Sequence, residues 1–181
     1  NNDAIVTISV GTAASSTNDN YNVSGNVSIT HNAAAGVLQN DAGSNIAVTA
    51  VNGNPANVGA AITTIQGGNL TLNADGSYAY NPPAGYEGAD NFTYTIDNGF
   101  GVASTATVNL SISGMIWFIN NAAGSAGDGR LSSPFNTLAG FTAINNGTGN
   151  SPAAGDNIFI YTGAGNYTGG TVLLNNQRLL G

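Results

Sequence analysis

The sequence predicts an all-β protein in which a β-sandwich is followed by a second unit built on parallel strands. The surface is wetted by Asn, Ser and Thr, which favour strands and turns, and charged residues are only 6% of the 181 residues. Short alternating apolar stretches, separated by turn residues, recur up to residue 113 in the manner of a sandwich. From residue 114 the apolar runs no longer alternate, which is typical of strands buried on both faces in parallel sheets.

The sandwich strands are predicted from alternation and turn chemistry. Leu70–Leu72 and Tyr78–Tyr80 flank an Asp-Gly turn, so we expect a hairpin in which leucines face tyrosines. One or two strands are expected around the apolar positions of residues 21–29. The other expected strands lie at residues 5–10, 46–51, 92–96 and 105–113.

The second unit begins with a dense apolar run at residues 115–119, directly after the short joint at 113–115. A Gly-rich loop at 124–133 precedes a short helix predicted for residues 136–145, whose start Pro134 favours. Further strands are expected at 158–161 and 172–174. This unit is small for a core of its own, so we expect it to be the beginning of a larger domain.

We divide the chain into residues 1–16, a sandwich over 17–113 and the second unit over 114–181. Residues 4–10 are similar to residues 106–112, the last strand of the sandwich. They are expected to be either the last strand of a preceding module, as in a tandem array, or the first strand of this sandwich. In the first case the apolar face of this strand, and the strands at 172–174 and 179–180, would pair with sheet edges of other copies and give filaments.

Charge and composition exclude several function classes. Two arginines, no lysine and nine acidic residues give a net charge of −7, so no basic patch exists for nucleic-acid binding. No apolar run is long enough for a membrane span, and no cysteine is present. His31 is the only imidazole, and its nearest acid in the sequence is Asp41. We therefore expect a structural histidine and no catalytic residues.

Residues 17–113 resemble the bacterial Ig-like/cadherin-like tandem modules of large surface adhesins, including VCBS-type repeats. The matching motifs occur in family order at residues 36–41, 48–51, 68–82 and 85–95. Residues 114–181 resemble the N-terminal cap and first coil of a right-handed parallel β-helix, through residues 117–122, 133–138, 155–160, 165–167 and 177–181. In such a cap, a helix carrying Phe135, Leu138, Phe141 and Ile144 would cover the open end of the coil.

The resemblance also implies calcium binding, because the family often carries an acid-rich run after its Asn-Asp pair. Here that run, residues 41–45, has a single acid. Calcium is bound by several carboxylates and carbonyls, so a site requires acids from different segments to converge. The predicted ligands are Asp19, Asp41, Asp90 and Asp97. In the alternative interpretation each acid caps a turn, and the protein has no cofactor.

The sequence thus predicts a non-enzymatic structural or adhesive module of a large bacterial cell-surface, matrix or fibre-forming protein. We expect it to be extracellular or on the bacterial cell surface. Its expected partners are neighbouring modules or copies through strand edges, and surface glycans. One alternative is a spacer in a secreted β-helix polysaccharide-degrading enzyme. Another is a carbohydrate-binding module, which would need an exposed aromatic platform drawn from Tyr21, Tyr86, Tyr161 and Tyr167.

Overall fold

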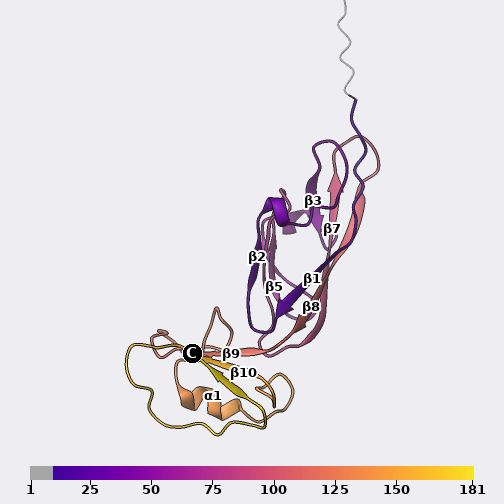
Figure 1. Cartoon of the computed structure of the whole chain (residues 1–181). Coiled ribbons are helices and arrows are strands. Elements are labelled where there is room, and N and C mark those ends of the chain that lie inside the picture. The colour runs from indigo at the N-terminus through magenta and orange to yellow at the C-terminus, as the bar shows by residue number, and fades with distance from the viewer. Residues whose placement is uncertain (1–9) are drawn as a thin grey trace, which may run out of the picture.

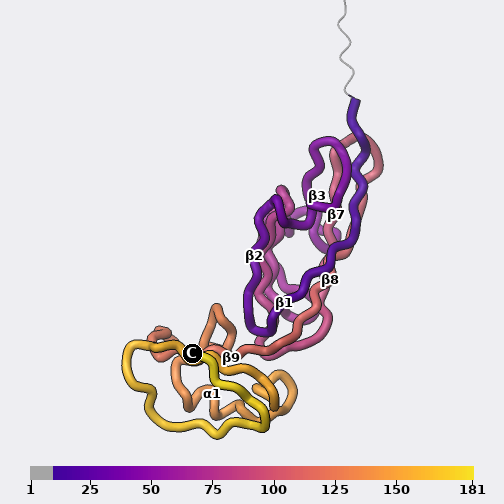
Figure 2. Tube along the Cα trace, viewed as in Figure 1, coloured from indigo at the N-terminus to yellow at the C-terminus, as the bar shows by residue number. Residues whose placement is uncertain are grey.

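The computed structural model describes residues 10–181, which form two parts joined end to end (Figure 1). An elongated β-sandwich comes first, and a smaller unit with a three-stranded sheet and one helix follows it. The tube in Figure 2 shows the chain passing directly from the last sandwich strand into the second unit. The strand predicted at residues 5–10 falls almost entirely outside the described residues.

Two four-stranded sheets make the sandwich, and their orders are β1-β8-β7-β3 and β2-β6-β5-β4. β1 runs parallel to β8, and every other neighbouring pair in the sandwich is antiparallel. The first sheet contains β1 (Asp19–Ser24), β3 (Ala47–Val51), β7 (Gly88–Asp97) and β8 (Ser104–Ser113). The second contains β2 (Ile29–His31), β4 (Ala61–Thr63), β5 (Asn69–Leu72) and β6 (Tyr78–Asn81). Short 3-10 helices lie at η1 (Ala33–Ala35) and η2 (Pro55–Asn57).

The predicted hairpin is confirmed in β5 and β6. Leu72 lies opposite Tyr78 and Leu70 opposite Tyr80, and all four side chains are buried. In the turn, the Asp75 carboxylate accepts hydrogen bonds from the Ser77 backbone N–H and hydroxyl at 3.0 and 2.6 Å. These bonds are the local reason for the tight turn between the strands.

The alternation predicted for the long strands appears as an inner and an outer face. On β7 and β8 the inward residues are buried aromatic and aliphatic side chains together with Asp90, while most outward residues are Thr, Asn and Ser. The core of the sandwich is made by residues from both sheets, among them Val23, Val48, Val51, Leu70, Leu72, Tyr78, Tyr80, Phe92, Tyr94, Ile96, Val108, Leu110 and Ile112. This burial of apolar area is the main stabilising contribution to the sandwich.

The second unit contains a parallel sheet of three strands in the order β11-β10-β9. These strands are β9 (Ile116–Ile119), β10 (Asn157–Ile160) and β11 (Arg178–Leu180). The prediction of a strand at residues 172–174 is wrong, because β11 takes the free edge of β10 instead. Residues 174–177 form a turn there, in which the Leu174 N–H donates to the Gln177 side-chain oxygen.

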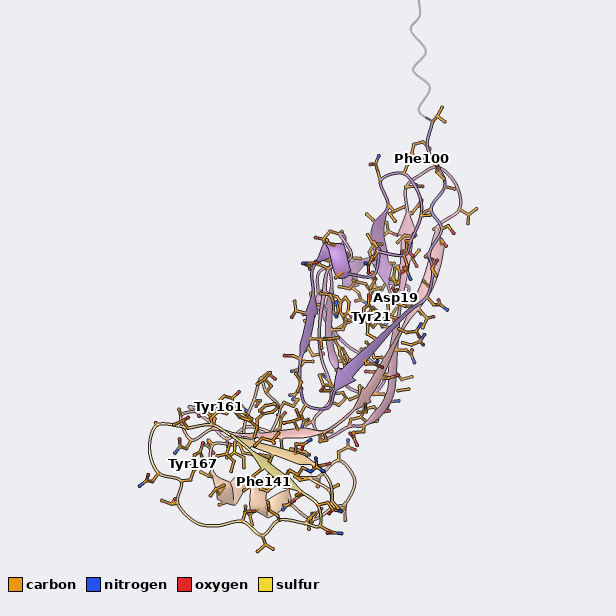
Figure 3. The ribbon with its side chains drawn as sticks, in the orientation of Figure 1. Asp19, Tyr21, Phe100, Phe141, Tyr161 and Tyr167 are labelled. Atoms are coloured by element: carbon orange, nitrogen blue, oxygen red, sulfur yellow. The ribbon has the colours of Figure 1, made fainter. Side chains whose placement is uncertain are left out.

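The predicted helix is confirmed as α1 (Leu138–Ile144), which begins after Thr137. The Thr137 hydroxyl accepts a hydrogen bond from the Gly140 N–H at 3.0 Å and so caps the helix. Phe141 of α1 is fully buried beneath the parallel sheet (Figure 3). It belongs to a second hydrophobic core with Met115, Trp117, Ile119, Phe135 and Ile158, which is separate from the sandwich core.

Candidate functional site

A pair of carboxyl groups meets inside the sandwich, on the hydroxyl of Tyr94. This hydroxyl is 3.1 Å from Asp19 Oδ2, 3.0 Å from Asp41 Oδ2 and 3.0 Å from the carbonyl oxygen of Val37. Asp19 is the first residue of β1, Tyr94 lies in the middle of β7, and Asp41 follows η1 in a turn. The Thr17 N–H also donates to Asp41, at 2.7 Å. Three segments distant in the sequence therefore supply one oxygen cluster.

This cluster carries uncompensated negative charge. A phenol has one hydrogen and can satisfy only one of these acceptors at a time. Both arginines of the chain lie in the second unit, at positions 130 and 178. Burial raises the pKa of Asp19 to about 6, and the charge of Asp41 adds to this shift while the bond from Tyr94 opposes it. Burial likewise raises the pKa of Asp41. A proton or a cation would relieve the repulsion.

Of the four predicted calcium ligands, the structure brings only Asp19 and Asp41 together. Asp90 lies near the opposite end of β7 from Asp97, and it accepts hydrogen bonds from the Tyr80 hydroxyl at 2.7 Å and from Thr64. Asp97 accepts from the Gly99 N–H at 2.9 Å, as a turn cap. Among residues 10–181 no group of three or more His, Cys, Asp and Glu side chains could hold a metal.

The Asp19–Asp41 pair nevertheless offers only oxygen atoms, which is the donor type that calcium prefers. The two carboxylates and the Val37 carbonyl would supply part of its coordination, and water would have to supply the rest. Calcium binding at this pair therefore stays a prediction. The predicted site now has two acidic ligands, Asp19 and Asp41, where the sequence suggested four.

The rings of His31, Tyr21 and Tyr86 pack against other residues of the sandwich. His31 stacks on Tyr78 with ring centroids 4.9 Å apart and an interplanar angle of 13°. Tyr21 packs against both rings, at 4.9 Å from His31 and 5.3 Å from Tyr78. The hydroxyl of Tyr86 donates to the carbonyl of Ala89. Each of these rings is therefore part of the packing of the sandwich.

The two tyrosines of the second unit lie in different places. The Tyr167 hydroxyl is bonded to the carbonyls of Ile119 and Tyr161, so it braces the parallel sheet. Tyr161 itself packs on Phe159 with centroids 4.9 Å apart, on the opposite side of the sheet from α1 (Figure 3). The four tyrosines proposed as a glycan platform thus do not share one surface.

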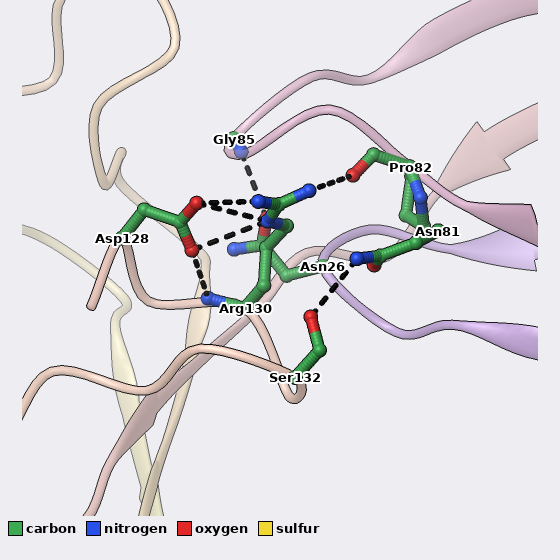
Figure 4. Close-up of polar contacts among 7 residues, drawn as sticks. All are labelled: Asn26, Asn81, Pro82, Gly85, Asp128, Arg130 and Ser132. Atoms are coloured by element: carbon green, nitrogen blue, oxygen red, sulfur yellow. Dashed lines mark hydrogen bonds and ion pairs between the residues drawn. The ribbon is translucent and has the colours of Figure 1, made fainter. Parts of the chain in front are cut away.

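The joint between the two parts is held by side chains that the sequence did not single out as a site (Figure 4). Arg130 pairs with Asp128, at 2.7 Å between Nη2 and Oδ2, and its Nη1 donates to the carbonyl of Pro82 in the sandwich at 3.3 Å. The Asn81 amide donates to the Ser132 hydroxyl at 2.9 Å. The Gly-rich loop of the second unit is therefore bonded to the loop after β6.

Hydrogen bonds from backbone N–H groups to Asn26 and Glu87 reinforce the joint. Asn26, which is 0% exposed and has a φ of 65°, accepts the Gly85 N–H on its side chain and the Leu131 N–H on its carbonyl, at 2.8 and 2.9 Å. Glu87 accepts the Met115 N–H at 3.1 Å. A connection with this many bonds is a packed interface and not a free hinge. The only feature of the sequence that pointed to this joint was Arg130, an isolated arginine in a chain with almost no cations.

The fold and the joint define a modular all-β protein, in which an antiparallel sandwich continues directly into a further unit. The family model for the bacterial cadherin-like domain matches residues 11–114, which is more than half of the chain. The protein therefore belongs to the bacterial cadherin-like domain family. No curated protein matches the chain. Among the described residues, no helix has the length and apolar character needed to cross a membrane.

Proposed function

We propose that the protein is a non-enzymatic structural or adhesive module of a bacterial cell-surface, matrix or fibre-forming protein. Membership of the bacterial cadherin-like family is consistent with an adhesive or structural role. The observation that carries the finer proposal is the joint, because Arg130, Asn26 and Glu87 hold the sandwich and the next unit at one angle. A module that transmits force or spaces a binding surface from a cell needs such a fixed connection.

The second unit is proposed to be the capped start of a right-handed parallel β-helix. Equivalent residues of its strands stack in register, as Trp117 with Ile158 and Leu179, and as Phe118 with Phe159 and Leu180. Such ladders of apolar residues are typical of coils that repeat along one axis. In this proposal Phe135 and α1 are the cap, because the backbone of Phe135 bonds to β9 on the edge away from β10, and α1 packs against the same hydrophobic core.

Association through strand edges is part of the proposal. β11 pairs with β10 on one side, and its residues Leu179 and Leu180 are 54% and 41% exposed. Exposed apolar residues on an edge strand favour pairing with a further strand. A further coil of the proposed β-helix, a neighbouring module or another copy would supply that strand outside the cell, where domains of this family typically lie.

Small-angle X-ray scattering of the whole chain tests the fixed joint. We expect one bent conformation for the wild type and a broader distribution of shapes for Arg130→Ala, because this variant loses the bond to Pro82. Arg178→Ala is the matched control, since Arg178 is the only other arginine and lies on the exposed strand β11. A wild type as flexible as Arg130→Ala would contradict the proposal.

An activity assay distinguishes the proposed function from its competitor, in which the chain is a spacer of a polysaccharide-degrading enzyme. The full-length protein is incubated with a panel of neutral and acidic polysaccharides, and reducing ends are measured. The proposal expects no turnover. Release of reducing ends by the purified protein would favour the enzyme.

A further inference from the structure

The outer face of the second sandwich sheet carries a trough that runs along the middle strand β6. Ala79 of β6 lies in register between Thr30 of β2 and Thr71 of β5. The small alanine between two larger threonines leaves a depression in the sheet surface. Two recesses share these three residues, with volumes of about 360 and about 190 Å³. They are therefore two stretches of one trough.

The lining of the trough combines apolar surface with amides and hydroxyls, and it carries little charge. Beyond the three central residues, amides and hydroxyls line both ends, from residues 69 and 81 at one end to residues 32, 73 and 77 at the other. Asp75 is the only carboxylate that lines either recess, His31 is the only basic side chain, and no arginine lines them. Hydrogen bonds from Ser77 lower the pKa of Asp75, so its carboxylate is ionised at neutral pH. Both of these bonds end on Oδ1, so Oδ2 remains for a ligand.

We infer that this trough binds an uncharged carbohydrate chain. Amide and hydroxyl side chains both donate and accept hydrogen bonds, as the hydroxyls of a sugar do. A ligand carrying phosphate, sulfate or carboxylate would find neither arginine nor lysine there and would meet the charge of Asp75. The larger recess has the size of a small-molecule site, and its continuation along β6 suits a chain of sugar units better than a single one.

Two other occupants fit the trough less well. A peptide strand binds by pairing with free backbone groups at a sheet edge, but β6 is already paired with β2 and β5 on its two sides. An apolar protein surface would need large exposed apolar partners, but the two aromatic residues that line the trough, Tyr78 and Tyr80, are each only 1% exposed.

The inference deepens the proposed adhesive function, because a glycan partner would give the module something to adhere to. Its failure would leave the scattering and turnover tests of the proposed function unaffected, since neither depends on the trough.

Native affinity electrophoresis is the experiment, because the net charge of −7 makes the whole chain migrate well. The probes are dextran, pullulan, galactomannan and mixed-linkage β-glucan, each included in the gel, with polygalacturonate as the anionic comparison. We expect at least one neutral polymer, and not polygalacturonate, to retard the wild type.

Ala79→Phe fills the trough and is expected to weaken this retardation about tenfold or more in apparent Kd. Its matched control is Ala89→Phe, since Ala89 is an exposed alanine of β7 in the other sheet, and this variant should be retarded like the wild type. Thr71→Val keeps the shape and removes a hydroxyl, so it should bind more weakly while folding normally. Circular dichroism establishes that each variant is folded.

Three outcomes would overturn the inference. One is a wild type that no neutral polymer retards. Another is retardation of Ala79→Phe equal to that of Ala89→Phe. The third is that a second copy of the protein occupies the trough. Sedimentation would then show self-association of the wild type that Ala79→Phe abolishes and that the polymers do not change.

Discussion

Gly85 of the sandwich lies directly against the backbone carbonyl of Asn150 in the second unit. A Cβ atom at residue 85 would overlap the Asn150 oxygen and approach the ring of Trp117 to 2.9 Å. The two parts of the chain are therefore in contact at a position where only glycine fits, which makes the joint sensitive to a single methyl group.

We predict that Gly85→Ala loosens the joint and destabilises the second unit by about 2 kcal/mol or more. Gly53→Ala is the control, because Gly53 has a similar φ, 73° against 67°, but no atom within 4 Å of the added methyl. Both variants carry the backbone strain, so their difference isolates the collision. Urea unfolding followed by Trp117 fluorescence measures it, and equal loss in both variants would contradict the prediction.

Asp90→Ala should destabilise the sandwich by about 3 kcal/mol, because it leaves the buried Tyr80 hydroxyl without its acceptor and leaves the Thr64 hydroxyl only the Gly68 carbonyl at 3.3 Å. Asp90 itself is 1% exposed, so water cannot replace the carboxylate without entering the core. Asp97→Ala, at the far end of the same strand, should cost less than about 1 kcal/mol. Chemical unfolding of the two variants provides the comparison, and similar losses would show that Asp90 has no special role.

Stability should rise on mild acidification through Asp19. Its folded pKa of about 6 lies above the ordinary value of 3.8, so the folded state binds the proton more tightly than the unfolded chain. This contribution is fully present below pH 3.8 and is lost as the pH rises through 6. Between pH 7.5 and pH 5 we expect a gain of about 1 kcal/mol in the wild type.

Asp19→Asn should lose this gain, because its amide is neutral at every pH. Unfolding is measured by urea titration at both pH values with a chelator present, so that no metal contributes. An equal gain in wild type and Asp19→Asn would assign the effect to other groups.

If Asp19 and Asp41 bind calcium, adding calcium to chelator-treated protein should raise the thermal unfolding midpoint by several degrees. The reason is that a ligand that binds only the folded state adds stability that grows with the logarithm of its concentration. Asp41→Asn should reduce the rise strongly, and Asp97→Asn should keep it. If millimolar calcium leaves the thermal midpoint of the wild type unchanged, Asp19 and Asp41 do not bind calcium. A proton would then be the only positive charge that neutralises this pair.

Much of the fold was predictable from local patterns. Leu70 to Leu72 and Tyr78 to Tyr80 alternate around an Asp-Gly turn, and both the pairing and the register of the hairpin follow from that. The helix was predictable because Leu138, Phe141 and Ile144 repeat at helical spacing. The expectation that this helix also carries Phe135 is wrong, because Phe135 lies before the helix and its backbone bridges Ile119 of β9. The strand expected at residues 172–174 was wrong, because a short apolar run is also compatible with an irregular segment, in which Val172 is 84% exposed and Leu173 packs against the second core.

The sequence alone therefore determined the β-rich class, the faces of the long strands and the scarcity of cations, since two arginines are the only ones that could neutralise an acid. Only the tertiary structure decided which acids meet. Asp19, Asp41 and Tyr94 come together because β1 joins the sheet beside β8, with β7 next in order, and no local pattern encodes a contact between such distant segments. The joint follows the same rule, since Arg130 reaches Pro82 only after both units have folded and packed. Local propensity acts over a few neighbouring residues, whereas sites of this kind depend on the pairing of whole strands.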